Sequence, residues 1–204
     1  MVKNMKIGIT GTIASGKTSV SILFRRMGFS VFNADNYAKM ATHASNPCFQ
    51  SLLEVLSEDV LDESGDIDRK KMASIIFNDE EKRKAVNAIV HPYVIEGMRN
   101  FFANHQKDAI VFAEIPLLFE ANLEEEFDKV LVVTCDKDTA IKRMEEDREY
   151  TRQEALDRYA SQIDPSLQVE KADFVIENNG DLKELGSKVN QFVAQTRKEI
   201  RRGA

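Results

Sequence analysis

Cysteine is scarce in this chain and tryptophan is absent. The two cysteines, Cys48 and Cys135, lie far apart without Cys-x-x-Cys spacing, which argues against a disulfide framework and a zinc site. No apolar run approaches the roughly 18 residues of a membrane-spanning helix, and no apolar segment of a secretion signal follows Lys3. We therefore expect a cytoplasmic protein with reduced cysteines and no membrane partner.

Basic residues are outnumbered by acidic ones, 28 to 34, which gives a formal net charge of −6. A general nucleic-acid binder draws its affinity from a basic surface, so we expect no nucleic-acid partner. A polyanionic ligand must then be held by a local site. The length of 204 residues suits one α/β core with an insertion better than two independent domains.

Residues 11–18 read Gly-Thr-Ile-Ala-Ser-Gly-Lys-Thr and match the phosphate-loop pattern at every required position. An apolar run at residues 6–10 precedes the loop, and an amphipathic helical pattern follows it. This strand, loop and helix order weighs against a chance glycine-rich turn. We expect the loop to hold ATP phosphates, with Lys17 on the β- and γ-phosphates and the Thr18 hydroxyl on Mg²⁺. The ATP-binding residues predicted here are Thr12, Ile13, Ala14, Ser15, Gly16, Lys17, Thr18 and Ser19.

The remaining pattern alternates strands and helices, which favours a parallel sheet with right-handed crossovers. Further strands are expected at residues 29–32, 109–113, 129–134 and 172–176. Residues 37–106 are helical throughout, with a new helix expected to start at Pro92 because its missing N–H suits a first turn. The predicted class is α/β: a three-layer phosphate-loop NTPase, nucleotide-kinase-like core with a five-stranded parallel sheet. Its predicted parts are a core of residues 1–36, 107–136 and 170–204, a helical acceptor-binding insertion of residues 37–106, and a helical lid of residues 137–169.

The loop alone does not separate kinases from switch GTPases. A guanine-reading Asn-Lys-x-Asp motif is missing, because the nearest segment, residues 134–137, reads Thr-Cys-Asp-Lys. A helical insertion after the second strand and an arginine-bearing lid after the fourth are instead the layout of small-molecule kinases. Such a lid excludes water from phosphoryl transfer.

Several segments together carry a more specific resemblance, over nearly the whole chain. They are residues 10–18, 33–35, 68–69, 90–92, 115–120, 158–162 and 172–180. In this combination and order the chain resembles the dephospho-CoA kinase family. The resemblance implies that ATP with Mg²⁺ phosphorylates the ribose 3′-hydroxyl of dephospho-CoA, the last step of coenzyme A synthesis. We expect small-molecule partners only, in a monomer or weak homo-oligomer.

The resemblance further assigns roles to single residues. Asp35 matches the carboxylate that activates the 3′-hydroxyl, with a second expected role on Mg²⁺ through water, and Arg148 is the candidate for stabilising the transferred charge, beside Lys17. Acceptor-binding positions are Asp35, Tyr37, Arg69, His91, Pro92, Leu117 and Leu118. Adenine-side positions are Arg143, Asn179 and Gly180.

Structural alternatives stay open for several of these residues. Asp35 could cap a helix beginning at Asn36. His91 could be an N-cap or a core histidine, and Arg69 a surface arginine. Leu117 and Leu118 fit a sheet-edge core equally well.

Three departures from the family pattern bear on the site. Thr12 and Ala14 replace glycines of the usual loop, so Ala14 is expected to avoid a positive φ. Asn33 stands where Asp is common, and the lid reads Asp147-Arg148 in place of Arg-Asp, which makes Arg152 a rival to Arg148. Two alternatives stay open. One is a different small-molecule kinase, and the other, which these changes motivate, is a nucleotide-binding regulator without turnover.

Overall fold

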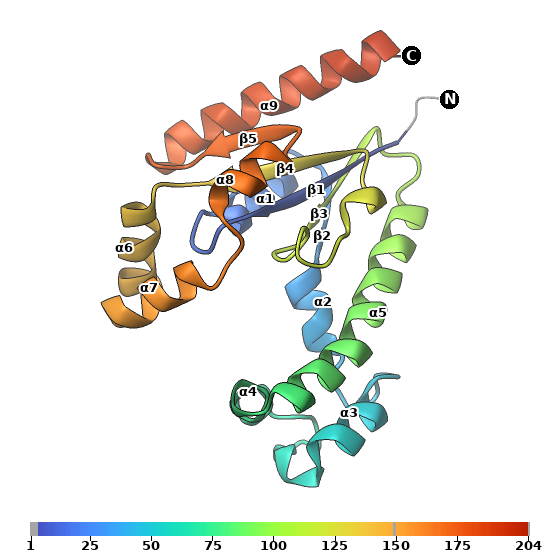
Figure 1. The fold of residues 1–204 in the computed structure, drawn as a ribbon. Helices are drawn as coiled ribbons and strands as arrows, with labels where there is room; N and C mark the ends of the chain where they lie inside the picture. The colour runs from blue at the N-terminus through green and yellow to red at the C-terminus, as the bar shows by residue number, and fades with distance from the viewer. Residues whose placement is uncertain (1–3, 149, 204) are drawn as a thin grey trace. The chain divides into compact units, whose positions relative to one another are not determined.

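The computed structural model describes residues 4–148 and 150–203, without the side chain of Arg148. Its centre is a five-stranded sheet with the strand order β2-β3-β1-β4-β5 (Figure 1). The strands are β1 (Met5–Gly11), β2 (Ser30–Asn33), β3 (Ile110–Glu114), β4 (Lys129–Thr134) and β5 (Phe174–Glu177). Strand β1 pairs in parallel with β3 and β4, and β4 pairs in parallel with β5. The predicted α/β class with a five-stranded parallel sheet is confirmed.

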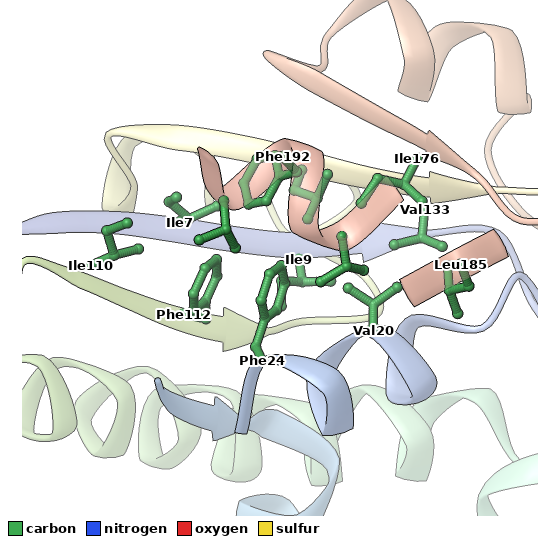
Figure 2. Packing of buried hydrophobic residues seen from close by; sticks show 13 residues of the cluster. Ile7, Ile9, Val20, Phe24, Ile110, Phe112, Val133, Ile176, Leu185 and Phe192 are labelled. Atoms are coloured by element: carbon green, nitrogen blue, oxygen red, sulfur yellow. The ribbon is translucent and has the colours of Figure 1, made fainter. Parts of the chain in front are cut away.

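One face of this sheet packs against α1 (Lys17–Arg26) and α9 (Leu182–Gly203). Alternate residues of the strands, such as Ile7 and Ile9 of β1, point to this face, because successive side chains of a strand face opposite ways. The rings of Phe24 and Phe112 stack there with centroids 4.0 Å apart (Figure 2). This packing fixes α1, and hence the loop before it, against the central strand.

The other face of β1 carries Gly8, where a Cβ would approach Leu118 Cδ1 to 2.6 Å. The segment that follows β3 therefore lies directly on the sheet. This segment includes a short 3₁₀ turn, η2 (Glu124–Glu126). Farther along the chain, α8 (Pro165–Glu170) contacts β4. The sheet is thus covered on both faces, as its apolar strands require.

Residues Asn33–Asn104 form one compact unit, called here the helical unit, and the other described residues form a second, called the core unit. The helices of the first unit are α2 (Ala34–Met40), α3 (Phe49–Leu56), η1 (Glu58–Val60), α4 (Arg69–Asn78) and α5 (Glu80–Asn104). Leu52, Leu56, Val60, Ile67 and Val86 are buried in its own core. The long helical region between two strands therefore folds around a core of its own.

The expected helix start at Pro92 is wrong, because Pro92 lies inside α5, which runs unbroken from Glu80 to Asn104. Proline has no N–H to donate to the carbonyl four residues earlier, that of Ala88, a loss of about 3 kcal/mol in a helix interior. Apolar residues on both sides of the proline nevertheless pack into one cluster, namely Val86, Ile89, Val90 and Tyr93. Their helical spacing makes a single continuous stripe, and this tertiary packing holds the helix together.

Two helices follow β4, namely α6 (Lys137–Arg148) and α7 (Arg152–Ala160). Thr151 and Glu154 form the capping box that their spacing indicates. Ile141, Met144 and Ala155 are buried between the two helices, and Ile13 and Ala14 of the phosphate loop pack against them. In the described part of the chain, no helix is both long and apolar enough to cross a bilayer.

Candidate active site

The phosphate loop joins the end of β1 at Gly11 to the start of α1 at Lys17. Gly11 has φ 144°, and a Cβ there would collide with the Val133 carbonyl. Gly16 is the N-cap of α1 in a left-handed conformation with φ 96°, and a Cβ there would collide with the Asn178 side chain. Both glycines of the motif are therefore required by the backbone. The loop opens onto the N-terminus of α1, where backbone N–H groups and the helix dipole favour phosphate.

Ala14 contradicts the expectation that its position avoids a positive φ, because its φ is 57°. A left-handed backbone costs a residue with a Cβ about 1–2 kcal/mol. Arg143 Nη1 donates to the Ala14 carbonyl at 3.2 Å, and Asn178 Nδ2 donates to the Ser15 carbonyl at 2.8 Å. These bonds from other elements hold the loop in a shape that its own sequence does not favour.

Substituting Ala14 with glycine is expected to raise the free energy of unfolding by up to about 1 kcal/mol. Relief of about 1–2 kcal/mol of strain is partly offset by the greater entropy of glycine in the unfolded chain, about 0.5–1 kcal/mol. Chemical denaturation measures the change. Ala38→Gly inside α2 is the matched control and is expected to destabilise by about 1 kcal/mol. Equal losses for both variants would contradict the strain at Ala14.

Arg143 and Asn179, which are predicted on the adenine side, belong to the core unit. In the structure, both side chains form hydrogen bonds with backbone groups of the protein. Arg143 Nη2 donates to the Asn178 carbonyl at 2.9 Å, so the guanidinium joins the loop to the segment after β5. Asn179 Oδ1 accepts from the Asp136 N–H at 2.8 Å, which ties that segment to the end of β4, and Gly180 follows it in an exposed position. Asn178 was not predicted as a site residue. In the sequence it is marked only by its position directly before the Asn179-Gly180 pair.

Lys17 and Thr18 stand at the start of α1. Lys17 Nζ donates to the carbonyls of Gly11 and Thr12, at 2.9 and 2.8 Å. The Thr18 hydroxyl donates to Glu114 Oε1 at 2.8 Å. Glu114 is only 3% exposed and is the last residue of β3, paired in register with Ile9 of β1. It was missed as a site residue, although an acidic residue ending a buried strand was a usable signal.

The oxygen atoms of Thr18 and Glu114 suit a hard cation such as Mg²⁺, which prefers oxygen ligands. Among the described residues there is no cluster of three or more His, Cys, Asp or Glu side chains that could hold a metal alone. Mg²⁺ is commonly held by one or two protein oxygens together with substrate phosphates and water. The residues present therefore fit a magnesium ion that arrives with a nucleotide.

Asp35 is exposed in the first turn of α2, within the helical unit. The alternative in which Asp35 caps a helix beginning at Asn36 is wrong, because Asn33 is the N-cap and its Oδ1 accepts from the Asn36 N–H at 2.8 Å. This bond gives Asn33 a structural role. Asp35 is left as a helix residue whose carboxylate is not used as the cap.

Tyr37 and His91 also belong to the helical unit. The Tyr37 ring stacks on Tyr93 at 4.7 Å, and a Cβ on Gly97 would collide with that ring. Burial, followed by a hydrogen bond with Tyr93, raises the pKa of Tyr37 above its usual value, so its phenol is neutral at physiological pH. His91 and Pro92 are exposed on α5, so the N-cap and core alternatives for His91 are both wrong.

Arg69 is the exposed first residue of α4, directly after its N-cap Asp68. In the core unit, Leu118 is fully buried under β1, which favours the core interpretation for this residue, whereas Leu117 is 51% exposed. Arg148 ends α6, and its side chain lies outside the described part of the structure. Arg152 Nη1 lies 3.6 Å from Glu145 Oε2.

A phosphate loop after the central strand, with a buried carboxylate at the end of the neighbouring strand, defines a phosphate-loop nucleotide-binding protein. A family model described as dephospho-CoA kinase matches residues 5–184. The chain belongs to the dephospho-CoA kinase family.

Individual relatives agree with this membership. A dephospho-CoA kinase of Bacillus licheniformis is 39% identical over 193 residues, covering 92% of this chain and 94% of the relative. A crystal structure of a Thermus thermophilus protein superposes with a TM-score of 0.81 at 31% identity, covering 95% of this chain and 98% of that one. A dephospho-CoA kinase from Campylobacter jejuni gives a TM-score of 0.73 at 26% identity, covering the same shares of both chains.

Proposed function

We propose that this protein transfers the γ-phosphoryl group of ATP to the ribose 3′-hydroxyl of dephospho-CoA and so forms coenzyme A. The observation that carries the proposal is the hydrogen bond between Thr18 and the buried Glu114, with Lys17 at the same loop. A hydroxyl, a carboxylate and an ammonium group held at the N-terminus of α1 are the groups that a Mg²⁺-nucleotide requires. Family membership then selects dephospho-CoA as the acceptor.

In this proposal the loop amides and Lys17 bind the β- and γ-phosphates, while Thr18 and Glu114 would hold Mg²⁺. When bound there, the ion would supply charge neutralisation at the phosphates. Asp35 accepts the proton of the 3′-hydroxyl, because a ribose hydroxyl is a poor nucleophile without a base. Arg148 stabilises the charge on the transferred group, and Tyr37, Arg69 and His91 bind the acceptor.

The two cysteines are both free thiols in the structure. Burial raises the pKa of the Cys135 thiol above its usual value, so this group stays protonated beside the Ala14 carbonyl. Two unpaired thiols support the proposed location in a reducing cytosol. We propose a monomer or weak homo-oligomer that acts on small molecules only.

The direct test is a coupled assay with purified protein, Mg²⁺, ATP and dephospho-CoA, with coenzyme A measured by mass spectrometry. Stoichiometric formation of coenzyme A and ADP is expected. Turnover only with nucleosides or nucleoside monophosphates would identify a different small-molecule kinase. Binding of ATP without turnover of any acceptor would identify a nucleotide-binding regulator.

A further inference from the structure

The segment between α7 and α8, called here the lid connection, contacts the phosphate loop through the side chain of Gln162. Gln162 Oε1 accepts a hydrogen bond from the Ile13 backbone N–H at 2.7 Å. An N–H group can only donate, so the oxygen of the carboxamide must face the loop. The side chain therefore fixes one peptide group of the loop, that between Thr12 and Ile13.

The same peptide group is held on its opposite side by Lys17. Its carbonyl oxygen, on Thr12, accepts from Lys17 Nζ at 2.8 Å and from the Ser15 N–H at 3.3 Å. In a trans peptide the N–H and the C=O point in opposite directions. Gln162 and Lys17 consequently bind opposite edges of one planar group, and its orientation decides whether Lys17 keeps the Thr12 carbonyl as an acceptor beside that of Gly11.

The chain around Gln162 is held firmly enough to serve this purpose. Gln162 lies between α7 and α8, and the Ser161 hydroxyl before it donates to the Arg158 carbonyl at 2.9 Å. After it, Asp164 caps α8 by accepting from the Ser166 N–H at 2.8 Å. Leu156 and Tyr159 of α7 pack in the same cluster as Ile13.

We propose that Gln162 is a positioning residue that orients Lys17 through the Thr12–Ile13 peptide group and so couples the lid connection to nucleotide binding. The inference rests on the proposed role of Lys17 at the nucleotide phosphates. Gln162 acts on the nucleotide only through the loop. Removing its acceptor oxygen frees the peptide to rotate and leaves Lys17 less well placed.

A double-mutant cycle on ATP binding tests the coupling, with affinities from calorimetry in Mg²⁺. Gln162→Met keeps the side-chain length without the carboxamide and is expected to weaken ATP binding about five- to tenfold, the usual worth of one such bond. In the Lys17→Ala background the same substitution is expected to change nothing, because its target is gone. An equal loss in both backgrounds, or no loss in either, would overturn the proposal.

Two further measurements separate positioning from a general structural role. The Ile13 amide proton is expected to move upfield in the NMR spectrum of Gln162→Met and to return in Gln162→Glu, which restores an oxygen acceptor. Gln153→Met is the matched control, because Gln153 is exposed on α7 and bonds only Asp157 among described residues. The control should leave ATP affinity and the chemical shift of the Ile13 amide proton unchanged. If Gln162→Met also left the Ile13 chemical shift unchanged, the proposal would be refuted. The double-mutant cycle measures ATP binding only. A failure to convert dephospho-CoA would therefore contradict the proposed function without contradicting the role of Gln162.

Discussion

Replacing Lys17 with alanine is expected to lower kcat for coenzyme A formation by about 10³-fold or more while the protein stays folded. Removing a single neutral donor from a developing charge costs about 10²–10³ in rate, and a full positive charge at the transferred phosphoryl contributes more. Lys17 is the first residue of α1, where alanine is a good helix former. Steady-state kinetics with saturating ATP and dephospho-CoA give kcat, and circular dichroism checks the fold.

Lys142→Ala is the control for the loss of a lysine, since Lys142 is exposed on α6 and pairs with Glu146 at 3.8 Å. We expect it to keep its rate within about twofold, because exposed ion pairs are worth little. A Lys17→Ala protein that retains more than a tenth of the normal kcat would show that the loop does not hold the transferred phosphate in the proposed way.

Asp35→Asn is expected to lower kcat by about 10²–10⁴ with little change in the KM for dephospho-CoA. Asparagine keeps the size of the side chain and can still bond the 3′-hydroxyl, but it cannot take up the proton. The variant is expected to lose only about 0.3–1 kcal/mol of stability, the worth of an acidic group in the first turn of a helix. Initial rates over a range of dephospho-CoA concentrations separate the two kinetic parameters.

Asp138→Asn provides a matched control, because Asp138 is likewise an exposed acid in the first turn of a helix, here α6. The same small loss of stability is expected there, with kcat preserved. If Asp35→Asn raised KM and left kcat intact, Asp35 would bind the acceptor without acting as its base.

The strands and the phosphate loop were predictable because their signals are local. The apolar run before Gly11 and the glycines at positions 11 and 16 identify a strand and a tight loop whatever surrounds them. The α/β class followed from the alternation of such segments. The capping box at Thr151 was readable for the same reason, since all of its atoms come from four consecutive residues.

Expectations at Pro92 and Ala14 were wrong because distant contacts outweighed local preference. A proline favours a helix start, but the apolar stripe of α5 packs continuously past Pro92. An alanine disfavours positive φ, but Arg143 bonds its carbonyl from another helix. In both cases the local cost is a few kcal/mol at most, which tertiary packing can exceed.

The sequence by itself determined that this protein has a phosphate loop on a parallel α/β core, because the required residues are adjacent in the chain. Only the tertiary structure decided that Glu114 meets Thr18, since parallel pairing of β3 beside β1 brings together side chains 96 positions apart. Likewise, Gln162 reaches Ile13 from 149 positions away. The local sequence around Glu114 or Gln162 does not identify its hydrogen-bond partner. Hydrogen bonds between distant residues depend on sheet register and helix packing, and these are determined by the fold of the whole chain.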